Sequence, residues 1–260
     1  MVCDLDGTLL QSDGAISPTS VNALDSARAA GVRVICATAR TPRAVRRIAG
    51  NEKFDVIVCA NGAVIWNATT DDIVAEECFD GIALQERIRT VRAANTELAF
   101  AVLSSRRMFV ESRYLGDRPP RDRELVDDIC EVVSGLDVVS VAVRYPNREV
   151  EAFIGSVETA FDGVGNVSRG SAVTVDIAPF GVTKATAVAQ LVMASGQRPE
   201  HTVVFGDMPS DLPLFAWAGY GIAVANAAQV VKAAAAEITA SNDRDGVAHA
   251  IAGLLGLPHE

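Results

Sequence analysis

Two carboxylates stand two residues apart near the start of the chain, in the stretch MVCDLDGTLL. Asp4 and Asp6 follow a short apolar run, and side chains at i and i+2 of a strand share a face, so we expect both to point into one site. Close ionised carboxylates repel each other, and one tends to hold a proton unless a cation neutralises them. One could then attack a phosphorus atom while the other protonates the leaving oxygen. A plain strand end before a turn at Gly7 is the alternative interpretation.

A second pair of carboxylates, Asp207 and Asp211, lies in GDMPSDLPLF. With Asp207 at a strand end and Asp211 in the first turn of a helix, both could face the same crevice. Carboxylate oxygens suit Mg²⁺, which binds through one or two carboxylates together with substrate phosphate. The alternative is that Asp211 only complements the N-terminus of the helix.

Lys184, in GVTKATAV, is one of three lysines in a chain with 20 arginines. It begins a predicted helix, the end that disfavours a cation, so we expect it to offset the charge of a phosphoryl group or a nucleophilic carboxylate. A solvated lysine is the alternative. Thr38 ends the apolar run VRVICAT and could donate its hydroxyl to a phosphate oxygen.

Alternating strands and helices must position these residues. Residues 32–38 and 55–60 read as buried parallel strands, and helices are expected over 17–31, from Ser17 and Pro18, and over 41–50, ending at Gly50. This order predicts an α/β fold with a doubly wound, mostly parallel sheet. Ligands bind at the carboxyl ends of such strands, where Asp4, Thr38, Asn61 and Asp207 stand.

From about residue 80 the pattern changes to that of an inserted α+β module. We expect a hairpin around Arg106, a polar loop, a short helix, a strand over 138–146 and a helix over 147–161. The alternation then resumes, with helices expected at 183–196, from about 210, at 227–237 and at 245–255, and strands at 201–207 and 221–226. The predicted domains are 1–79 and 179–260 for the core and 80–178 for the insert.

Taken together, DLDGTLL, Thr38, Lys184 and GDMPSD resemble, in order, the four motifs of the haloacid dehalogenase superfamily. The sequence NGA after the third strand and the position of the insert are similar to the Cof-like phosphatases, the subgroup with a large α/β cap between the second and third motifs. The resemblance covers essentially the whole chain. It implies a Rossmann-like core and a Mg²⁺-dependent hydrolase of a small phosphorylated metabolite, such as a sugar phosphate.

By this resemblance, Asp4 would be the nucleophile that forms an aspartyl-phosphate, and Asp6 the general acid and base. Superfamily dehalogenases lack the second aspartate, so halide displacement is disfavoured. The expected phosphate-binding residues are Leu5, Thr38, Ala39, Asn61 and Lys184. The expected metal-binding residues are Asp4, Asp6, Asp207 and Asp211, with Asp6 using its backbone carbonyl.

Two departures from the family pattern leave other functions open. Ala39 stands where glycine is usual, which restricts the backbone beside the phosphate site. Ser210 stands where asparagine is usual, which loses an amide donor. These departures leave a non-catalytic phosphometabolite-binding protein as an alternative. A phosphosugar mutase is a further alternative by the resemblance, since capped relatives with the same pair of aspartates move phosphate within a sugar. A receiver-like signalling module is disfavoured because it has no use for a second acid or a cap.

Charge and hydropathy limit the kinds of partner that the protein is expected to bind. A net charge of -10 over 260 residues disfavours nucleic acid as a partner. The longest apolar runs fall short of the roughly 18 residues of a membrane span, and no secretory signal is evident, so we expect a cytoplasmic monomer or homodimer. The five cysteines, an odd number without a CxxC pair, are expected to be free thiols.

The insert carries only arginines as basic residues, 12 of them between positions 81 and 178. One interpretation is a solvated face balanced by neighbouring acids. The other is that one or two of these arginines bind an anionic leaving group.

Overall fold

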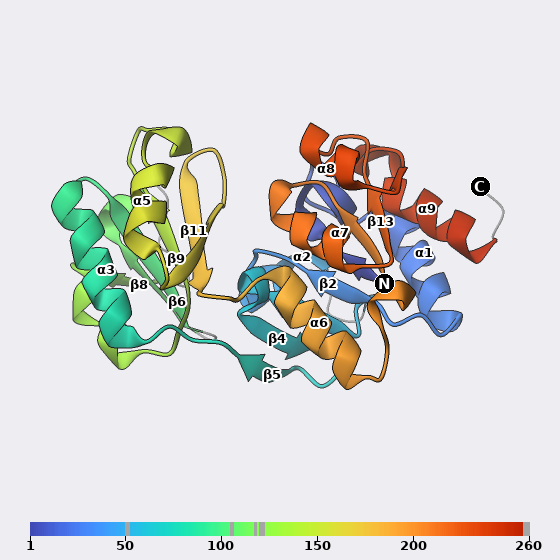
Figure 1. Ribbon diagram of the computed structural model, residues 1–260, viewed down its shortest axis with the longest axis horizontal. Helices are drawn as coiled ribbons and strands as arrows, with labels where there is room; N and C mark the ends of the chain where they lie inside the picture. The colour runs from blue at the N-terminus through green and yellow to red at the C-terminus, as the bar shows by residue number, and fades with distance from the viewer. Residues whose placement is uncertain (50–52, 105–106, 117–118, 120–122, 257–260) are drawn as a thin grey trace. The chain divides into compact units, whose positions relative to one another are not determined.

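The computed structural model describes residues 1–49, 53–104, 107–116, 119 and 123–256. The chain forms two compact units, Met1–Val74 with Lys184–Glu260, and Ala75–Thr183. Figure 1 distinguishes them by colour, the inserted unit running from green to yellow. The compact units divide between residues 74 and 75 and between residues 183 and 184. The domain boundaries expected at residues 80 and 178 stay a prediction.

The first unit is built on an eight-stranded sheet in the order β14-β13-β12-β1-β2-β3-β4-β5. The five neighbouring pairs from β14 to β3 are parallel, whereas β4 is antiparallel to β3. The strands are Val2–Cys3 (β1), Ile35–Ala37 (β2), Val56–Cys59 (β3), Val64–Asn67 (β4), Asp72–Glu76 (β5), Val203–Gly206 (β12), Tyr220–Ala223 (β13) and Glu237–Ile238 (β14). Because β1 lies between β2 and β12, the strand order reverses there, which confirms the doubly wound architecture and marks the crevice for a ligand.

Helices cover this sheet, with α1 packed on α9 and α6 packed on α7. Their bounds are Pro18–Ala29 (α1), Pro42–Ala49 (α2), Lys184–Ala194 (α6), Leu212–Trp217 (α7), Gln229–Ala234 (α8) and Gly246–Leu255 (α9). Ser17 caps α1 by accepting a hydrogen bond from the Ser20 backbone N–H at 2.9 Å, as its position before Pro18 predicts.

The second unit has a six-stranded sheet in the order β10-β11-β9-β6-β7-β8. All of its pairs are antiparallel except β7 with β8. The elements are Gly81–Ala94 (α3), Ala99–Ser104 (β6), Met108–Glu111 (β7), Ser112–Leu115 (α4), Glu124–Val126 (β8), Val138–Arg144 (β9), Ile154–Phe161 (α5), Gly165–Arg169 (β10) and Thr174–Pro179 (β11). Alternate strand residues, such as Phe100 and Val102, pack with apolar residues of α3 and α5 in one core. An α+β cap is therefore present.

Several expected elements differ from those observed. The hairpin β6–β7 is confirmed, although Arg106 at its turn and Gly50 at the end of the second helix lie outside the described residues. The helix expected over 227–237 ends at Ala234, because Glu237–Ile238 pairs with β13 and this tertiary contact overrides the helix propensity of alanine. The helix expected over 147–161 begins only at Ile154, after a 3₁₀ turn at Val150–Ala152.

Smaller features complete the comparison. The short helix expected before the 138–146 strand is two 3₁₀ turns, Ile129–Glu131 and Val133–Gly135. All five cysteines are free thiols, as predicted, and Cys78 alone among them is exposed. Within the described ranges, the model contains no helix with the length and apolar character needed to cross a bilayer.

Candidate active site

The loop after β1 separates the two aspartates that open the chain. β1 ends at Cys3, and residues 5–9 form an irregular turn in which Asp6 (φ -72°, ψ 118°) and Gly7 (φ 77°) are not helical, so the expectation that one strand carries Asp4 and Asp6 is wrong. Asp4 is 5% exposed, whereas the Asp6 side chain is 54% exposed. Gly7 makes the turn possible with a φ of 77°, and a Cβ there would lie 2.4 Å from Asp207 Oδ2.

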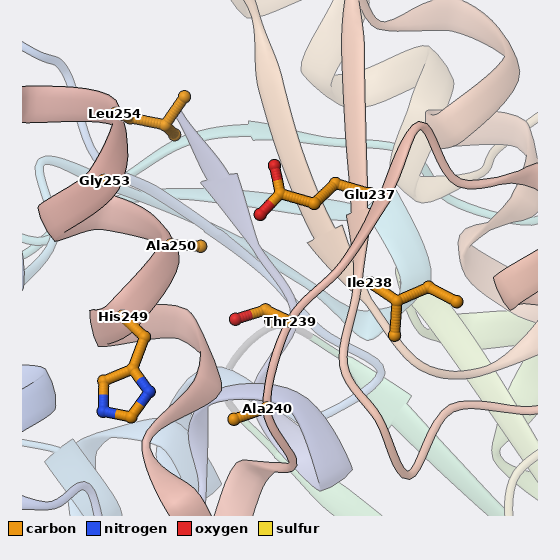
Figure 2. A pocket seen from close by; sticks show the side chains of 8 residues that line it. All are labelled: Glu237, Ile238, Thr239, Ala240, His249, Ala250, Gly253 and Leu254. Atoms are coloured by element: carbon orange, nitrogen blue, oxygen red, sulfur yellow. The ribbon is translucent and has the colours of Figure 1, made fainter.

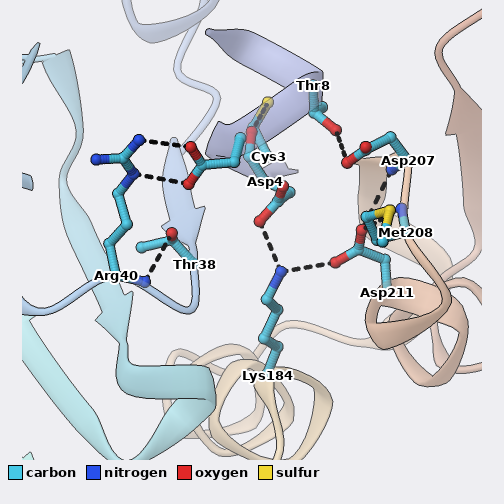
Figure 3. A network of polar contacts seen from close by, with 10 residues as sticks. Cys3, Asp4, Thr8, Thr38, Arg40, Lys184, Asp207, Met208 and Asp211 are labelled. Atoms are coloured by element: carbon cyan, nitrogen blue, oxygen red, sulfur yellow. Dashed lines mark hydrogen bonds and ion pairs between the residues drawn. The ribbon is translucent and has the colours of Figure 1, made fainter. Parts of the chain in front are cut away.

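Lys184, the first residue of α6, joins two of the predicted site carboxylates. Its Nζ donates to Asp4 Oδ1 at 2.6 Å and to Asp211 Oδ1 at 2.8 Å (Figure 3). Burial by itself would lower the pKa of Lys184, but the two carboxylates outweigh burial and raise it. Lys184 is therefore a buried, permanently charged ammonium between two loops of the site.

Asp4, Asp207 and Asp211 form a buried group whose carboxylate oxygens lie within 4.8 Å of one another. Burial raises the pKa of Asp4 to about 8, with Lys184 opposing this shift and Asp211 adding to it. Burial also raises the pKa of Asp207 to about 6, against the hydrogen bond from Thr8 and with the added repulsion of Asp211. When ionised, three carboxylates against one ammonium leave two negative charges in excess, which equals the charge of one divalent cation. The donor set, all oxygen, also fits such an ion.

Hydrogen bonds hold the loop after β12, which carries both Asp207 and Asp211. Asp211 Oδ2 accepts from the backbone N–H groups of Asp207, at 3.2 Å, and Met208, at 3.1 Å. Asp207 Oδ1 accepts from the Thr8 hydroxyl at 3.0 Å. Backbone amides, rather than the exposed Ser210, thus orient the Asp211 carboxylate.

Asp6 has a partner that the sequence reasoning missed. Arg40 donates from Nε to Asp6 Oδ2 at 2.7 Å and from Nη2 to Asp6 Oδ1 at 2.5 Å. The Asp6 side chain therefore lies apart from the carboxylate group formed by the other three predicted metal-binding residues. One feature of the sequence could have indicated this contact: Arg40 stands two residues after Thr38, at the end of the same strand.

Thr38 and Asn61 lie side by side at the ends of β2 and β3. Thr38 is fully buried, and its hydroxyl accepts from the Arg40 backbone N–H at 3.1 Å. Asn61 has a φ of 57° and donates its backbone N–H to the Thr38 carbonyl at 3.1 Å. Ala39 does not adopt the positive φ that would demand glycine, so its Cβ is accommodated without strain of that kind. Leu5 is buried directly after Asp4.

A separate pocket of about 430 Å³ lies beside α9 (Figure 2). It is lined by residues 237–240 together with His249, Ala250, Gly253 and Leu254. None of the predicted site residues lines it, so it has no part in the site described above.

Comparison with known proteins agrees with this geometry. The model of the haloacid dehalogenase-like hydrolase family matches residues 1–251, and the chain belongs to this family. A crystal structure of a haloacid dehalogenase-like hydrolase from Bacteroides thetaiotaomicron superposes with a TM-score of 0.78 at 25% identity, covering 97% of this chain and 98% of the other.

Two curated relatives extend the comparison. The 5-amino-6-(5-phospho-D-ribitylamino)uracil phosphatase YcsE of Bacillus subtilis is 27% identical, with 95% of this chain and 92% of the relative covered. Endoribonuclease YBEY, chloroplastic, of Arabidopsis thaliana is also 27% identical over 96% of this chain, but the chain spans only 45% of that protein. Family and relatives together identify the chain as a phosphatase.

Proposed function

We propose that the protein is a Mg²⁺-dependent phosphomonoester hydrolase that acts on a small phosphorylated metabolite through an aspartyl-phosphate intermediate. The observation that carries the proposal is the buried group of Asp4, Asp207 and Asp211, which when ionised carries two more negative charges than Lys184 balances. A structural role alone would not favour such an excess, because an unpaired buried charge costs several kcal/mol.

The metal-binding residues in this proposal are Asp4, Asp207 and Asp211, together with the backbone carbonyl of Asp6. When bound, Mg²⁺ supplies charge neutralisation for the carboxylates and for the oxygens of the substrate phosphate. The Asp6 side chain is then left for proton transfer, in keeping with its separation from the other carboxylates.

In the first half-reaction, an oxygen of Asp4 attacks phosphorus and the bond from phosphorus to the leaving oxygen breaks. Asp6, which carries a proton once its ion pair with Arg40 has opened, gives that proton to the leaving oxygen. Lys184 and the Thr38 hydroxyl bind the oxygens of the transferring phosphoryl group, aided by backbone groups of Leu5, Ala39 and Asn61. The products are an alcohol and the acyl phosphate of Asp4, the aspartyl-phosphate.

In the second half-reaction, water attacks the same phosphorus atom and the bond to the Asp4 oxygen breaks. The Asp6 carboxylate accepts the proton of the water, which restores the starting state and releases inorganic phosphate. Arg40, with two hydrogen bonds to Asp6, sets the direction of this carboxylate in the free protein. Its 54% exposure leaves the Asp6 side chain open to the leaving group and to water.

The substrate class we propose is the phosphate monoester of a sugar or similar polyol. The relative from Bacillus subtilis is named for a substrate whose phosphate sits on a ribityl chain, which supports this class. We also propose that the protein works in the cytoplasm as a monomer or homodimer.

Release of inorganic phosphate from a panel of phosphomonoesters, with and without Mg²⁺ and without any added bisphosphate, tests the proposal. Wild type should release phosphate only with the metal, and Asp4→Asn should reduce the rate by about 10⁴-fold or more. Asp71→Asn, at an exposed carboxylate of the same unit, is the matched control and should retain full activity. Equal release by wild type and Asp4→Asn would contradict the proposal, whereas a strict requirement for a bisphosphate would favour a mutase.

A further inference from the structure

Two asparagines, Asn226 and Asn242, bind the loop after β1 that contains Asp6, although this loop lies more than 200 residues before them in the sequence. Asn226 Nδ2 donates to the Gly7 carbonyl at 2.7 Å, and Asn242 Nδ2 donates to the Leu10 carbonyl at 2.8 Å. The asparagines are joined, because the Asn242 backbone N–H donates to Asn226 Oδ1 at 3.0 Å. We refer to this pair as the asparagine clamp.

The donor or acceptor character of each partner group fixes the orientation of both side-chain amides. A backbone N–H only donates, so Asn226 must present its amide oxygen to Asn242 and its amide nitrogen to Gly7. A carbonyl only accepts, so the Asn242 amide nitrogen must face Leu10. Neither aspartate nor an apolar residue could reproduce these contacts. Asn242 is 8% exposed, so its bonds are protected from water.

The clamp connects to the carboxylate group through a second contact. Ala228, two residues after Asn226, donates its backbone N–H to the Asp207 carbonyl at 2.9 Å. The segment 226–228 thus binds the loop after β1 at Gly7 and the loop after β12 at Asp207. Thr8, next to Gly7, links the same two loops directly, because its hydroxyl donates to the Asp207 carboxylate at 3.0 Å.

We propose that Asn226 and Asn242 are positioning residues that fix the spacing between the loop of Asp4 and Asp6 and the loop of Asp207. Their effect on turnover rests on the proposed function, whereas their effect on metal affinity rests only on the carboxylate group. Displacement of catalytic groups by about 1 Å can cost about 100-fold in rate, so loss of the clamp should be visible in kcat rather than in stability alone.

The test compares Asn226→Asp, Asn226→Ala and Asn242→Asp with the control Thr239→Val. Thr239 donates its hydroxyl to the Gly246 carbonyl at 2.7 Å, so the control removes a side chain to carbonyl bond of the same length outside the site. For each variant we would measure the melting temperature, the binding of Mg²⁺ alone by calorimetry, and kcat and KM on the best phosphomonoester.

We expect Asn226→Asp to lower kcat by about 10- to 100-fold, with KM changed less than kcat, and to weaken Mg²⁺ binding by about fivefold or more. Thr239→Val should stay within about twofold of wild type in both, even where its melting temperature falls equally. The double variant Asn226→Ala with Asn242→Asp should lose less than the product of the single losses, because the two side chains share one network.

The outcomes separate this inference from the proposed function. If wild type is active and both the Asn226 variants and Asn242→Asp match Thr239→Val in kcat and Mg²⁺ affinity, the clamp is only structural and the inference is overturned. If wild type releases no phosphate, the proposed function fails, but the Mg²⁺ titrations still decide on the clamp. Should Asn226→Asp not fold, Asn226→Ala and Asn242→Asp give the same decision.

Discussion

Two charged clusters, one taken from each unit, differ in burial and in charge balance. In the first unit, Lys184 and the carboxylates it binds, Asp4 and Asp211, are at most 7% exposed, and negative charge remains in excess. In the inserted unit, Arg107 and Glu124 form a one-to-one pair at the surface, with side chains 57% and 47% exposed. Burial of charge is costly while exposed pairs contribute little, so the contrast separates a site built to bind something from a surface that is merely solvated.

A closer comparison lies within the first unit, between the pairs Arg40–Asp6 and Arg46–Asp71. Both pairs have an Nη2 to Oδ1 distance of 2.5 Å, and their side chains are exposed to a similar degree. Only the first pair stands beside Thr38 and the carboxylate group. Both contacts are exposed arginine–aspartate ion pairs, although Asp6 accepts two hydrogen bonds from Arg40 whereas Asp71 accepts one from Arg46 and one from Trp66. We expect the location of the first pair to decide its role.

The largest expected effect comes from Lys184→Met. Removal of the ammonium leaves the buried carboxylates without a cation, which should lower the free energy of unfolding by about 3–5 kcal/mol in metal-free buffer. Phosphatase activity should fall by about 10³-fold. Denaturant unfolding with and without Mg²⁺ measures the first effect, and Mg²⁺ should recover part of it. Lys232→Met, on α8 of the same unit, is the control, and equal losses in the two variants would contradict a special role for the buried ammonium of Lys184.

Arg40→Ala should be next in size. Without its two hydrogen bonds, Asp6 loses its fixed direction, and kcat should fall by about 10- to 100-fold. Arg46→Ala removes the matching pair and should leave kcat unchanged. Steady-state kinetics of both variants on one substrate gives the answer, and similar kcat values for the two variants would show that location does not matter here.

The pH dependence of metal-free stability should reveal the excess charge directly. The raised pKa values of Asp4, about 8, and Asp207, about 6, mean that the folded state binds protons that the unfolded state releases above about pH 4. The stability that these groups contribute should therefore be fully present below about pH 4 and should be lost as the pH rises through about 6 and about 8. Melting temperatures in chelator across this range test the prediction, and saturating Mg²⁺ should flatten the profile. A metal-free profile that rises with pH would contradict it.

The smallest effect is expected in the inserted unit, from Arg107→Ala. Its pair with Glu124 is fully at the surface, so the melting temperature and kcat should stay at their wild-type values. A rise in KM alone would instead favour the interpretation that a cap arginine binds the leaving group. Thermal melting and a substrate titration distinguish the two.

Sequence patterns predicted much of the architecture because they record local physics. The apolar runs ending at Thr38 and Ala60, and the cap at Ser17, predicted parallel strands and a helix that the structure contains. The short edge strand Glu237–Ile238 could not be predicted, since its alanine-rich context favours helix and only its pairing with β13 makes it a strand.

For the site, the sequence by itself determined which side chains are available, namely the aspartates of two motifs, Thr38 and Lys184. Only the tertiary structure decided which partner each side chain contacts: Asp4 is buried against Lys184, and Asp6 binds Arg40. A two-residue spacing places side chains on one face only while a regular strand continues, and here β1 already ends at Cys3, before Asp4. The contacts of Asn226 and Asn242 join segments more than 200 residues apart in sequence, and no local pattern specifies a contact over that distance.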